Sequence, residues 1–159
     1  MTLSKHGEEL IKEFEGLRLN AYRDSAGVWT IGYGSTRYHD ERAVKPGDKL
    51  VNENQADALF KNTLGQYVTA VNDLVTVILS QNQFDALVSF TYNEGIGALK
   101  RSTLLKKLNT GDYDEAADQL LLWNKITDPI TGHKIALDAL IKRRAKERQL
   151  FKSTSTLII

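Results

Sequence analysis

The sequence lacks cysteine and has only two prolines in 159 residues. Without cysteine, a disulfide scaffold, a thiolate zinc site, an iron–sulfur cluster and a cysteine nucleophile are excluded. Pro46 and Pro129 lie in short polar turns, and no Pro/Gly-rich linker, low-complexity tract or internal repeat divides the chain. We therefore expect residues 1–159 to form one domain around one hydrophobic core.

A strong charge of one sign is also lacking, because 21 Lys and Arg oppose 20 Asp and Glu. This balance does not indicate a nucleic-acid partner, and we expect none. The N-terminus lacks the apolar stretch of about 7–15 residues of a secretory signal. No window approaches the run of about 18 apolar residues that spans a membrane, and residues 157–159 are too few for an anchor. We expect a monomer that starts in the cytoplasm and does not insert stably into a membrane.

The first part of the chain predicts a short helix followed by a small sheet. Leu10, Ile11 and Phe14 recur at helical spacing, and Gly16 is a stop signal. Residues 20–36 are rich in β-branched and aromatic side chains around a turn at residues 24–27, which is typical of a β-hairpin.

The remainder predicts helices. An apolar stripe runs over about residues 53–79, with Asn52 as the helix N-cap. Residues 128–132 are expected to form a turn. Further helices are expected from Ser80, near residues 104–108, after Asp112 and over about residues 135–151. Apart from the early hairpin the chain should be helical, which is an α+β fold with a mostly helical body.

Residues typical of a reactive site gather in the early hairpin. Glu15 ends the first helix, Asp24 lies in the turn and Thr30 lies on the return strand, while Gly32 and Gly34 leave one strand face bare. A bare face beside two carboxylates suits an extended polymer. Paired carboxylates of this kind perform glycoside hydrolysis, in which one donates a proton and the other activates water. The alternative is that the glycines form bulges and both carboxylates are only solvated.

These residues carry a resemblance to a known family. The runs 15–24 and 27–34 are similar to the active-site signature of the phage-type lysozymes, or endolysins, of glycoside hydrolase family 24. Glu15, Asp24 nine positions later and Thr30 six positions further keep that signature's intervals. Residues 81–87, the segment 92–95 and the pattern Arg143-Arg144-x-x-Glu147 resemble later parts of the same family.

The resemblance implies a muramidase that cleaves the β-1,4 bond between N-acetylmuramic acid and N-acetylglucosamine in peptidoglycan, without a cofactor. Glu15 would be the general acid, Asp24 the second carboxylate, and Thr30 would hold the attacking water. The substrate-binding residues implied are Gly34, Thr36, Tyr92 and Asn93. A plainer interpretation of Tyr92 is a core aromatic, and of Asn93 a polar residue at a helix end.

The resemblance also implies a lysozyme-like fold of two lobes around a cleft. The N-terminal lobe would span about residues 1–52 with the hairpin, the connecting helix about 53–79, and the helical lobe about 80–159. The family further implies that the protein waits in the host cytoplasm and reaches the periplasm and cell wall after a holin opens the membrane.

One position departs from the family. Many relatives have histidine directly after the Gly-x-Gly of the hairpin, where this chain has Ser35. An ion pair made by that histidine would be absent, which bears on local stability more than on catalysis. His6, His39 and His133 are far apart in sequence, so we expect three surface residues and no metal site.

The last helix region is strongly basic. Because Arg144 shares the apolar stripe, we expect it to point inward and to need a carboxylate partner, for which Glu15 is a candidate. The other charges would draw the protein to an anionic cell wall or membrane. Against two acidic residues, Asp138 and Glu147, this region has seven basic ones: Lys134, Lys142, Arg143, Arg144, Lys146, Arg148 and Lys152.

Two other functions stay open. A lytic transglycosylase cuts the same bond with one glutamate and without water, but Asp24 and Thr30 argue against it. A wall-binding or structural phage module that kept the fold without the chemistry would not need the intact set of Glu15, Asp24 and Thr30.

Overall fold

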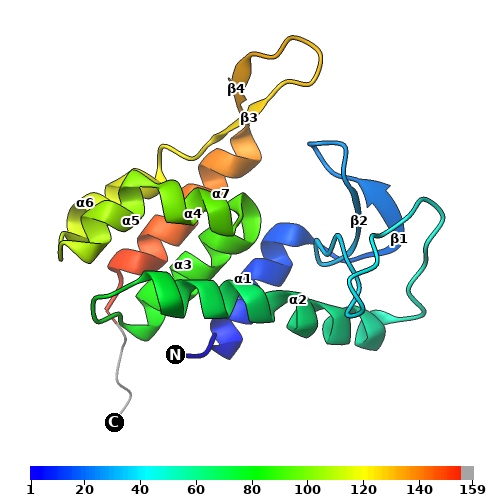
Figure 1. The fold of residues 1–159 in the computed structure, drawn as a ribbon, viewed down its shortest axis with the longest axis horizontal. Coiled ribbons are helices and arrows are strands. Elements are labelled where there is room, and N and C mark those ends of the chain that lie inside the picture. Colours follow the sequence, from blue (N-terminus) through cyan, green and yellow to red (C-terminus); the bar gives the residue numbers. More distant parts are fainter. Residues whose placement is uncertain (155–159) are drawn as a thin grey trace. The chain divides into compact units, whose positions relative to one another are not determined.

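The structure, a computed structural model, describes residues 1–154, so the C-terminal segment 157–159 lies outside it. The described residues form seven α-helices and two two-stranded antiparallel sheets (Figure 1). The predicted mostly helical α+β fold is thereby confirmed. The chain gathers into two compact units, one made of Glu9–Gln66 and the other of Met1–Glu8 with the chain from Tyr67 onward. The boundary falls within helix α2 (Glu53–Leu74).

The unit Glu9–Gln66 contains the predicted hairpin. Helix α1 (Lys5–Glu15) ends at Gly16, which has a φ of +72°. Strands β1 (Arg18–Arg23) and β2 (Trp29–Gly32) then pair antiparallel, with Tyr22 opposite Thr30 and a register shift earlier in β1. Strand β2 is mostly buried, and the side chains that form the centre of this core are Ile11, Ile31, Leu59 and Phe60.

The other unit is helical at its centre. Helices α3 (Gln81–Glu94) and α7 (Asp138–Lys152) pack against each other, and α5 (Thr103–Asn109) packs against α6 (Tyr113–Leu120). Ser80 caps α3 at the predicted start of the helix, and it does so with a complete capping box. The buried side chains include Phe84, Leu87, Phe90, Leu104, Leu108 and Leu120.

The first residues of the chain are bound tightly within this same unit. Buried Asp85 of α3 accepts hydrogen bonds from the backbone N–H and the hydroxyl of Ser4, and from the Gln81 amide. The hydroxyl of Ser4 in turn accepts from the N–H of Gly7 at 3.1 Å. A Cβ at Gly7 would approach the Asp85 carboxyl carbon to 2.8 Å, so only glycine fits there.

Two predicted boundaries were wrong, and one helix was missed. Helix α2 ends at Leu74 instead of about residue 79, because the side chain of Asn109 donates to the Leu74 carbonyl and accepts from the Thr76 N–H. Helix α7 begins at Asp138, not at about residue 135. The short helix α4 (Ile96–Arg101) was not predicted.

A second hairpin was also missed. Strands β3 (Lys125–Thr127) and β4 (Lys134–Ala136) pair across the predicted turn at residues 128–132, so the early hairpin is not unique. Strands of three residues are too short to show an alternating pattern. No helix in the described part of the chain is long and apolar enough to cross a bilayer.

Candidate active site

Glu15 lies at the junction of helix and hairpin in the unit Glu9–Gln66. It is the last residue of α1 and is half-buried. Gly34, which has a φ of +84°, packs directly against it, since a Cβ at Gly34 would lie 2.5 Å from Glu15 Oε1. The glycine backbone therefore forms one wall of the space around the carboxylate, and a larger residue would displace it.

Asp24 is fixed by the turn of the hairpin. Its Oδ1 accepts hydrogen bonds from the backbone N–H groups of Ala26 at 2.9 Å and Val28 at 2.8 Å. Its own N–H donates to the Val28 carbonyl at 2.9 Å. This local closure orients one carboxylate oxygen toward the backbone and leaves Oδ2 for other contacts.

Thr30 is hydrogen-bonded to Val28 as well. It is 3% exposed, and its hydroxyl donates to the Val28 carbonyl at 2.9 Å. Val28 thus contacts Asp24 through its N–H and Thr30 through its carbonyl. Because the Thr30 hydroxyl hydrogen is used in this bond, its oxygen lone pairs are the groups that can hold a water.

The pKa of the Tyr22 phenol is affected by both carboxylates. Burial raises the pKa of the Tyr22 phenol above its ordinary value, the charges of Glu15 and Asp24 raise it further, and Arg18 lowers it. The Arg18 guanidinium lies 4.6 Å from the centre of the Tyr22 ring. Both carboxylates are therefore within electrostatic reach of the same phenol. Tyr22 was not among the predicted site residues, and its pairing opposite Thr30 is known only from the structure.

The loop after β2 is tied down by Ser35, the residue that departs from the family pattern. Ser35 is fully buried, exchanges two backbone hydrogen bonds with Ile31, and its hydroxyl is 2.8 Å from that of Thr63 on α2. Thr63 also donates to the Leu59 carbonyl at 3.0 Å. A neutral hydrogen-bonded pair thus anchors this position, and the neighbouring Thr36 is exposed.

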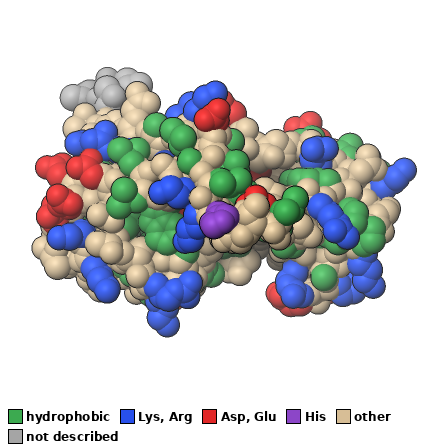
Figure 2. Space-filling model, turned by 90° about the horizontal axis from the view of Figure 1, so that it is seen from above, with side chains coloured by type: hydrophobic (Ala, Val, Ile, Leu, Met, Phe, Trp, Pro, Cys, Tyr) green, Lys and Arg blue, Asp and Glu red, His purple; other side chains and the backbone are tan. Residues whose placement is uncertain are grey.

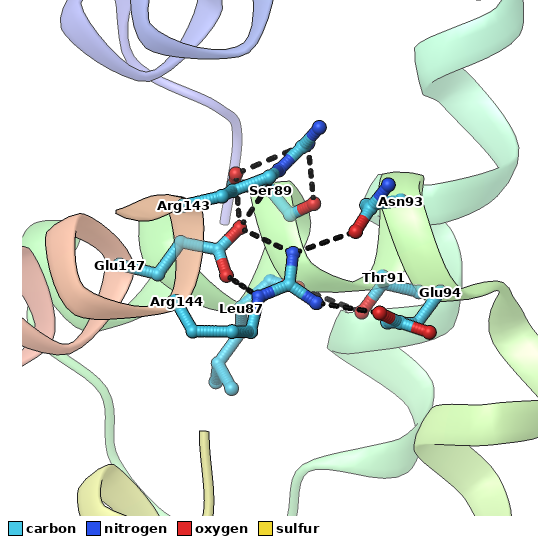
Figure 3. A network of polar contacts seen from close by, with 8 residues as sticks. All are labelled: Leu87, Ser89, Thr91, Asn93, Glu94, Arg143, Arg144 and Glu147. Atoms are coloured by element: carbon cyan, nitrogen blue, oxygen red, sulfur yellow. Dashed lines mark hydrogen bonds and ion pairs between the residues drawn. The ribbon is translucent and has the colours of Figure 1, made fainter. Parts of the chain in front are cut away.

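Tyr92 and Asn93 lie at the end of α3, in the other unit. Tyr92 is only 8% exposed, and its ring centre is 5.1 Å from that of Tyr67. Asn93 is exposed, and its side-chain oxygen accepts a hydrogen bond from Arg144 Nη2 at 2.8 Å. The amide nitrogen of Asn93 is turned away from Arg144 (Figure 3). Asn93 therefore presents a hydrogen-bond donor outward.

Behind Asn93 is a buried network of charges (Figure 3). Arg144 and Glu147 are both fully buried, with Arg144 Nε 2.6 Å from Glu147 Oε1. Arg144 also pairs with Glu94 at 2.8 Å. Arg143 contacts Glu147 at 3.3 Å and donates to the carbonyl of Ser89, whose hydroxyl donates to Glu147 at 2.6 Å.

Burial and opposite charges shift the pKa values of Arg144 and Glu94 in this network. Burial lowers the pKa of Arg144, and the carboxylates of Glu147 and Glu94 oppose that shift. Burial likewise raises the pKa of Glu94, against the charge of Arg144. The predicted inward orientation of Arg144 and its need for a carboxylate are confirmed, and Glu147 and Glu94 are carboxylates that meet it. The pairing of Arg144 with Glu15 stays a prediction.

Other charged residues lie on the surface. His6, His39 and His133 are exposed, as predicted. Of the seven basic residues in the last helix region, Arg143 and Arg144 belong to the buried network, and Arg148 pairs with Asp118 at 2.9 Å on the surface. Among residues 1–154, no group of three or more His, Asp or Glu side chains is placed to hold a metal ion.

Comparison with known proteins identifies the family of the chain. The family described as phage lysozyme matches residues 12–147. An endolysin of Acyrthosiphon pisum secondary endosymbiont phage 1 is 42% identical over 96% of this chain and 99% of its own length. An endolysin of Bacillus phage B103 is 44% identical, and the chain spans 54% of that longer protein.

A solved structure extends the similarity to the fold. The endolysin from Escherichia coli O157:H7 phage FAHEc1 is 43% identical, with 96% of this chain and 94% of that chain covered and a TM-score of 0.87. The matched family region, residues 12–147, spans Glu15, Asp24 and the residues of the buried network. The chain therefore belongs to the phage lysozyme family.

Proposed function

We propose that this chain is an endolysin that hydrolyses the β-1,4 bond between N-acetylmuramic acid and N-acetylglucosamine in bacterial peptidoglycan. The observation that carries the proposal is the fixed pair of carboxylates around one hairpin, with Glu15 against the Gly34 backbone and Asp24 held by two N–H groups. Membership of the phage lysozyme family and its endolysin relatives support the same substrate.

The proposed mechanism assigns each group one task. Glu15 donates its proton to the glycosidic oxygen as the bond to the sugar C1 breaks. A water held between Asp24 and the Thr30 hydroxyl attacks C1, and Asp24 takes up its proton. An inverting reaction of this type needs the two carboxyls about 6.5–9.5 Å apart, so that a water fits between them. Asp24 Oδ2, which the turn leaves for other contacts, is the oxygen we assign to the water.

The substrate contacts are also proposals. Asn93 would donate its amide N–H to a sugar oxygen or an N-acetyl carbonyl, because Arg144 already occupies its oxygen. Gly34 and Thr36 would line the sugar chain beside Glu15, and Tyr92 would contribute the small part of its ring that is exposed. The monomer would reach the wall after a holin opens the membrane.

Mass spectrometry of fragments released from purified peptidoglycan tests the reaction. The proposal predicts fragments that end in reducing N-acetylmuramic acid. Fragments lighter by one water, with anhydro ends, would instead establish a lytic transglycosylase. If no fragments are released while the protein still sediments with the peptidoglycan, the wall-binding module is correct and the proposed hydrolysis is wrong.

A further inference from the structure

Exposed aliphatic side chains gather around the second hairpin, which takes no part in the proposed chemistry. Ile130, at the tip of its turn, is 92% exposed, and Leu122, just before β3, is 65% exposed. Ile135 on β4 and Ile141 on the first turns of α7 are each exposed by more than 40%. Such a concentration of exposed aliphatic groups within some twenty residues is characteristic of a contact surface rather than of chance exposure.

The hairpin has two different faces. Ile126 is paired with Ile135, so both side chains lie on one face of the ribbon. The opposite face carries the pairs Thr127–Lys134 and Lys125–Ala136. The ribbon projects beyond the helices of its own unit, at the top of Figure 1. It is therefore an amphipathic element whose aliphatic face and lysine face are both accessible.

The turn exposes the aliphatic side chain at its tip, and its acidic residue accepts hydrogen bonds from within the turn. Asp128 Oδ1 accepts from the N–H of Ile130 at 2.9 Å, and Oδ2 accepts from the Thr131 hydroxyl at 3.1 Å. Lys134 adjoins the turn, Lys125 lies at the other end of the ribbon and Lys142 lies on α7. All three lysines are exposed, as is Asp138. The face that carries the hairpin is turned toward the viewer in Figure 2, where hydrophobic side chains lie among those of lysine and arginine.

We propose that this hairpin, with Leu122 and Ile141 at its base, is a peripheral binding surface for a lipid bilayer that contains anionic lipids. Ile130 at the tip would enter the boundary between headgroups and acyl chains, and Lys134 beside the turn would reach lipid phosphates while its apolar stem lies along the ribbon. A hydrated glycan gains little from isoleucine, which offers no hydrogen bond.

Sedimentation with lipid vesicles, in the absence of peptidoglycan, tests this surface independently of the proposed hydrolysis. Vesicles of phosphatidylglycerol with phosphatidylethanolamine should bind the wild-type chain more tightly than phosphatidylcholine vesicles, and added salt should reduce the difference. Ile130→Ser should weaken the partition coefficient about tenfold, as expected for an exposed isoleucine that becomes buried on binding.

Ile78→Ser is the matched control, because Ile78 lies in the same unit and is 89% exposed but is remote in sequence from the hairpin. Unchanged vesicle binding by Ile78→Ser would support the surface, provided that Ile130→Ser binds less. Equal losses in both variants, or no vesicle binding by the wild type, would overturn it. So would an Ile130→Ser variant that binds vesicles normally but cleaves purified peptidoglycan more slowly, since the hairpin would then be a glycan contact.

Discussion

The two hairpins of this protein share one hydrogen-bond pattern in the turn and differ in the burial of their strands. In each, an aspartate opens the turn and accepts the N–H of the residue two positions later at 2.9 Å, Ala26 for Asp24 and Ile130 for Asp128. The first hairpin lies on a core. Ile31 of β2 is fully buried and Thr30 is 3% exposed. In the second, every residue of β3 and β4 except half-buried Ile126 is exposed.

The difference teaches that the turn alone does not create a site. Asp24 becomes part of a candidate active site because Glu15 and Gly34 lie beside the same hairpin and because Ser35 is fixed to Thr63. Both carboxylate oxygens of Asp128 accept hydrogen bonds from residues of its own turn. Burial of the strand converts a local motif into a rigid support, whereas an exposed strand leaves a surface for contact.

The largest expected effect comes from removing the charge of Asp24, with the same substitution at Asp128 for comparison. Asparagine retains the oxygen that accepts the turn N–H groups, so Asp24→Asn and Asp128→Asn should both fold with nearly wild-type stability. Asp24→Asn should lower the rate of peptidoglycan cleavage by about 10²–10⁴-fold, the usual contribution of a general base. Release of reducing ends from purified peptidoglycan measures this. Equal rates for the two variants would remove Asp24 from the mechanism.

The next effect concerns stability and compares the two strands directly. Ile31→Ala should lower the free energy of unfolding by about 2–5 kcal/mol, because it opens a cavity in a core where the side chain is fully buried. Ile135→Ala, at a 42% exposed position, should cost much less, about 0.5–1 kcal/mol. Urea denaturation of both variants gives the two values. A similar loss in both would contradict the contrast in burial.

A third pair separates backbone strain from contact with Glu15. Gly34 and Gly132 both have positive φ, +84° and +73°, but only a Cβ at Gly34 would meet another group. Both alanine variants should be destabilised by about 1 kcal/mol. Gly34→Ala should also slow cleavage by about 10–100-fold, because it displaces the Glu15 carboxylate, whereas Gly132→Ala should keep the wild-type rate. Normal cleavage by Gly34→Ala would mean that Glu15 tolerates displacement.

The smallest effect is in the loop that follows the first hairpin. Burial, together with the hydrogen bond to Asp48 at 2.7 Å, raises the pKa of Tyr38 to about 12. A raised pKa gives stability that is complete below pH 10 and is lost as the pH rises toward 12. With allowance for solvent screening, the wild type should lose about 1 kcal/mol more than Tyr38→Phe over that range. Parallel denaturation curves at pH 9 and 11.5 test this, and identical losses would contradict it.

The sequence predicted the first hairpin and missed the second for a physical reason. Residues 20–36 combine aromatic and β-branched side chains with a turn signal, and that is enough to identify two strands. Residues 125–127 and 134–136 are too few to show alternation, so only the turn between them could be identified. The end of α2 depends on Asn109, whose side chain reaches residues more than thirty positions earlier. Local patterns do not contain that contact.

The candidate site was predictable in its residues and not in its supports. Glu15, Asp24 and Thr30 have a recognisable spacing, and the stripe of the last helix indicated that Arg144 points inward. The carboxylates that hold Arg144 were not predictable, because Glu94 comes from another helix and Glu147 was one of several charged residues nearby. The bond between Ser35 and Thr63 likewise joins a loop to a distant helix.

The most direct test of the account is the rate of peptidoglycan cleavage by Glu15→Gln, with Glu9→Gln as its control. Both glutamates lie on α1, but Glu9 is exposed, whereas Glu15 is half-buried and packs against Gly34. The account predicts that Glu15→Gln folds normally and loses at least about 10²-fold in rate, as removal of a general acid requires, while Glu9→Gln keeps the wild-type rate. A Glu15→Gln variant that releases reducing muramic acid ends as fast as the wild type would contradict it.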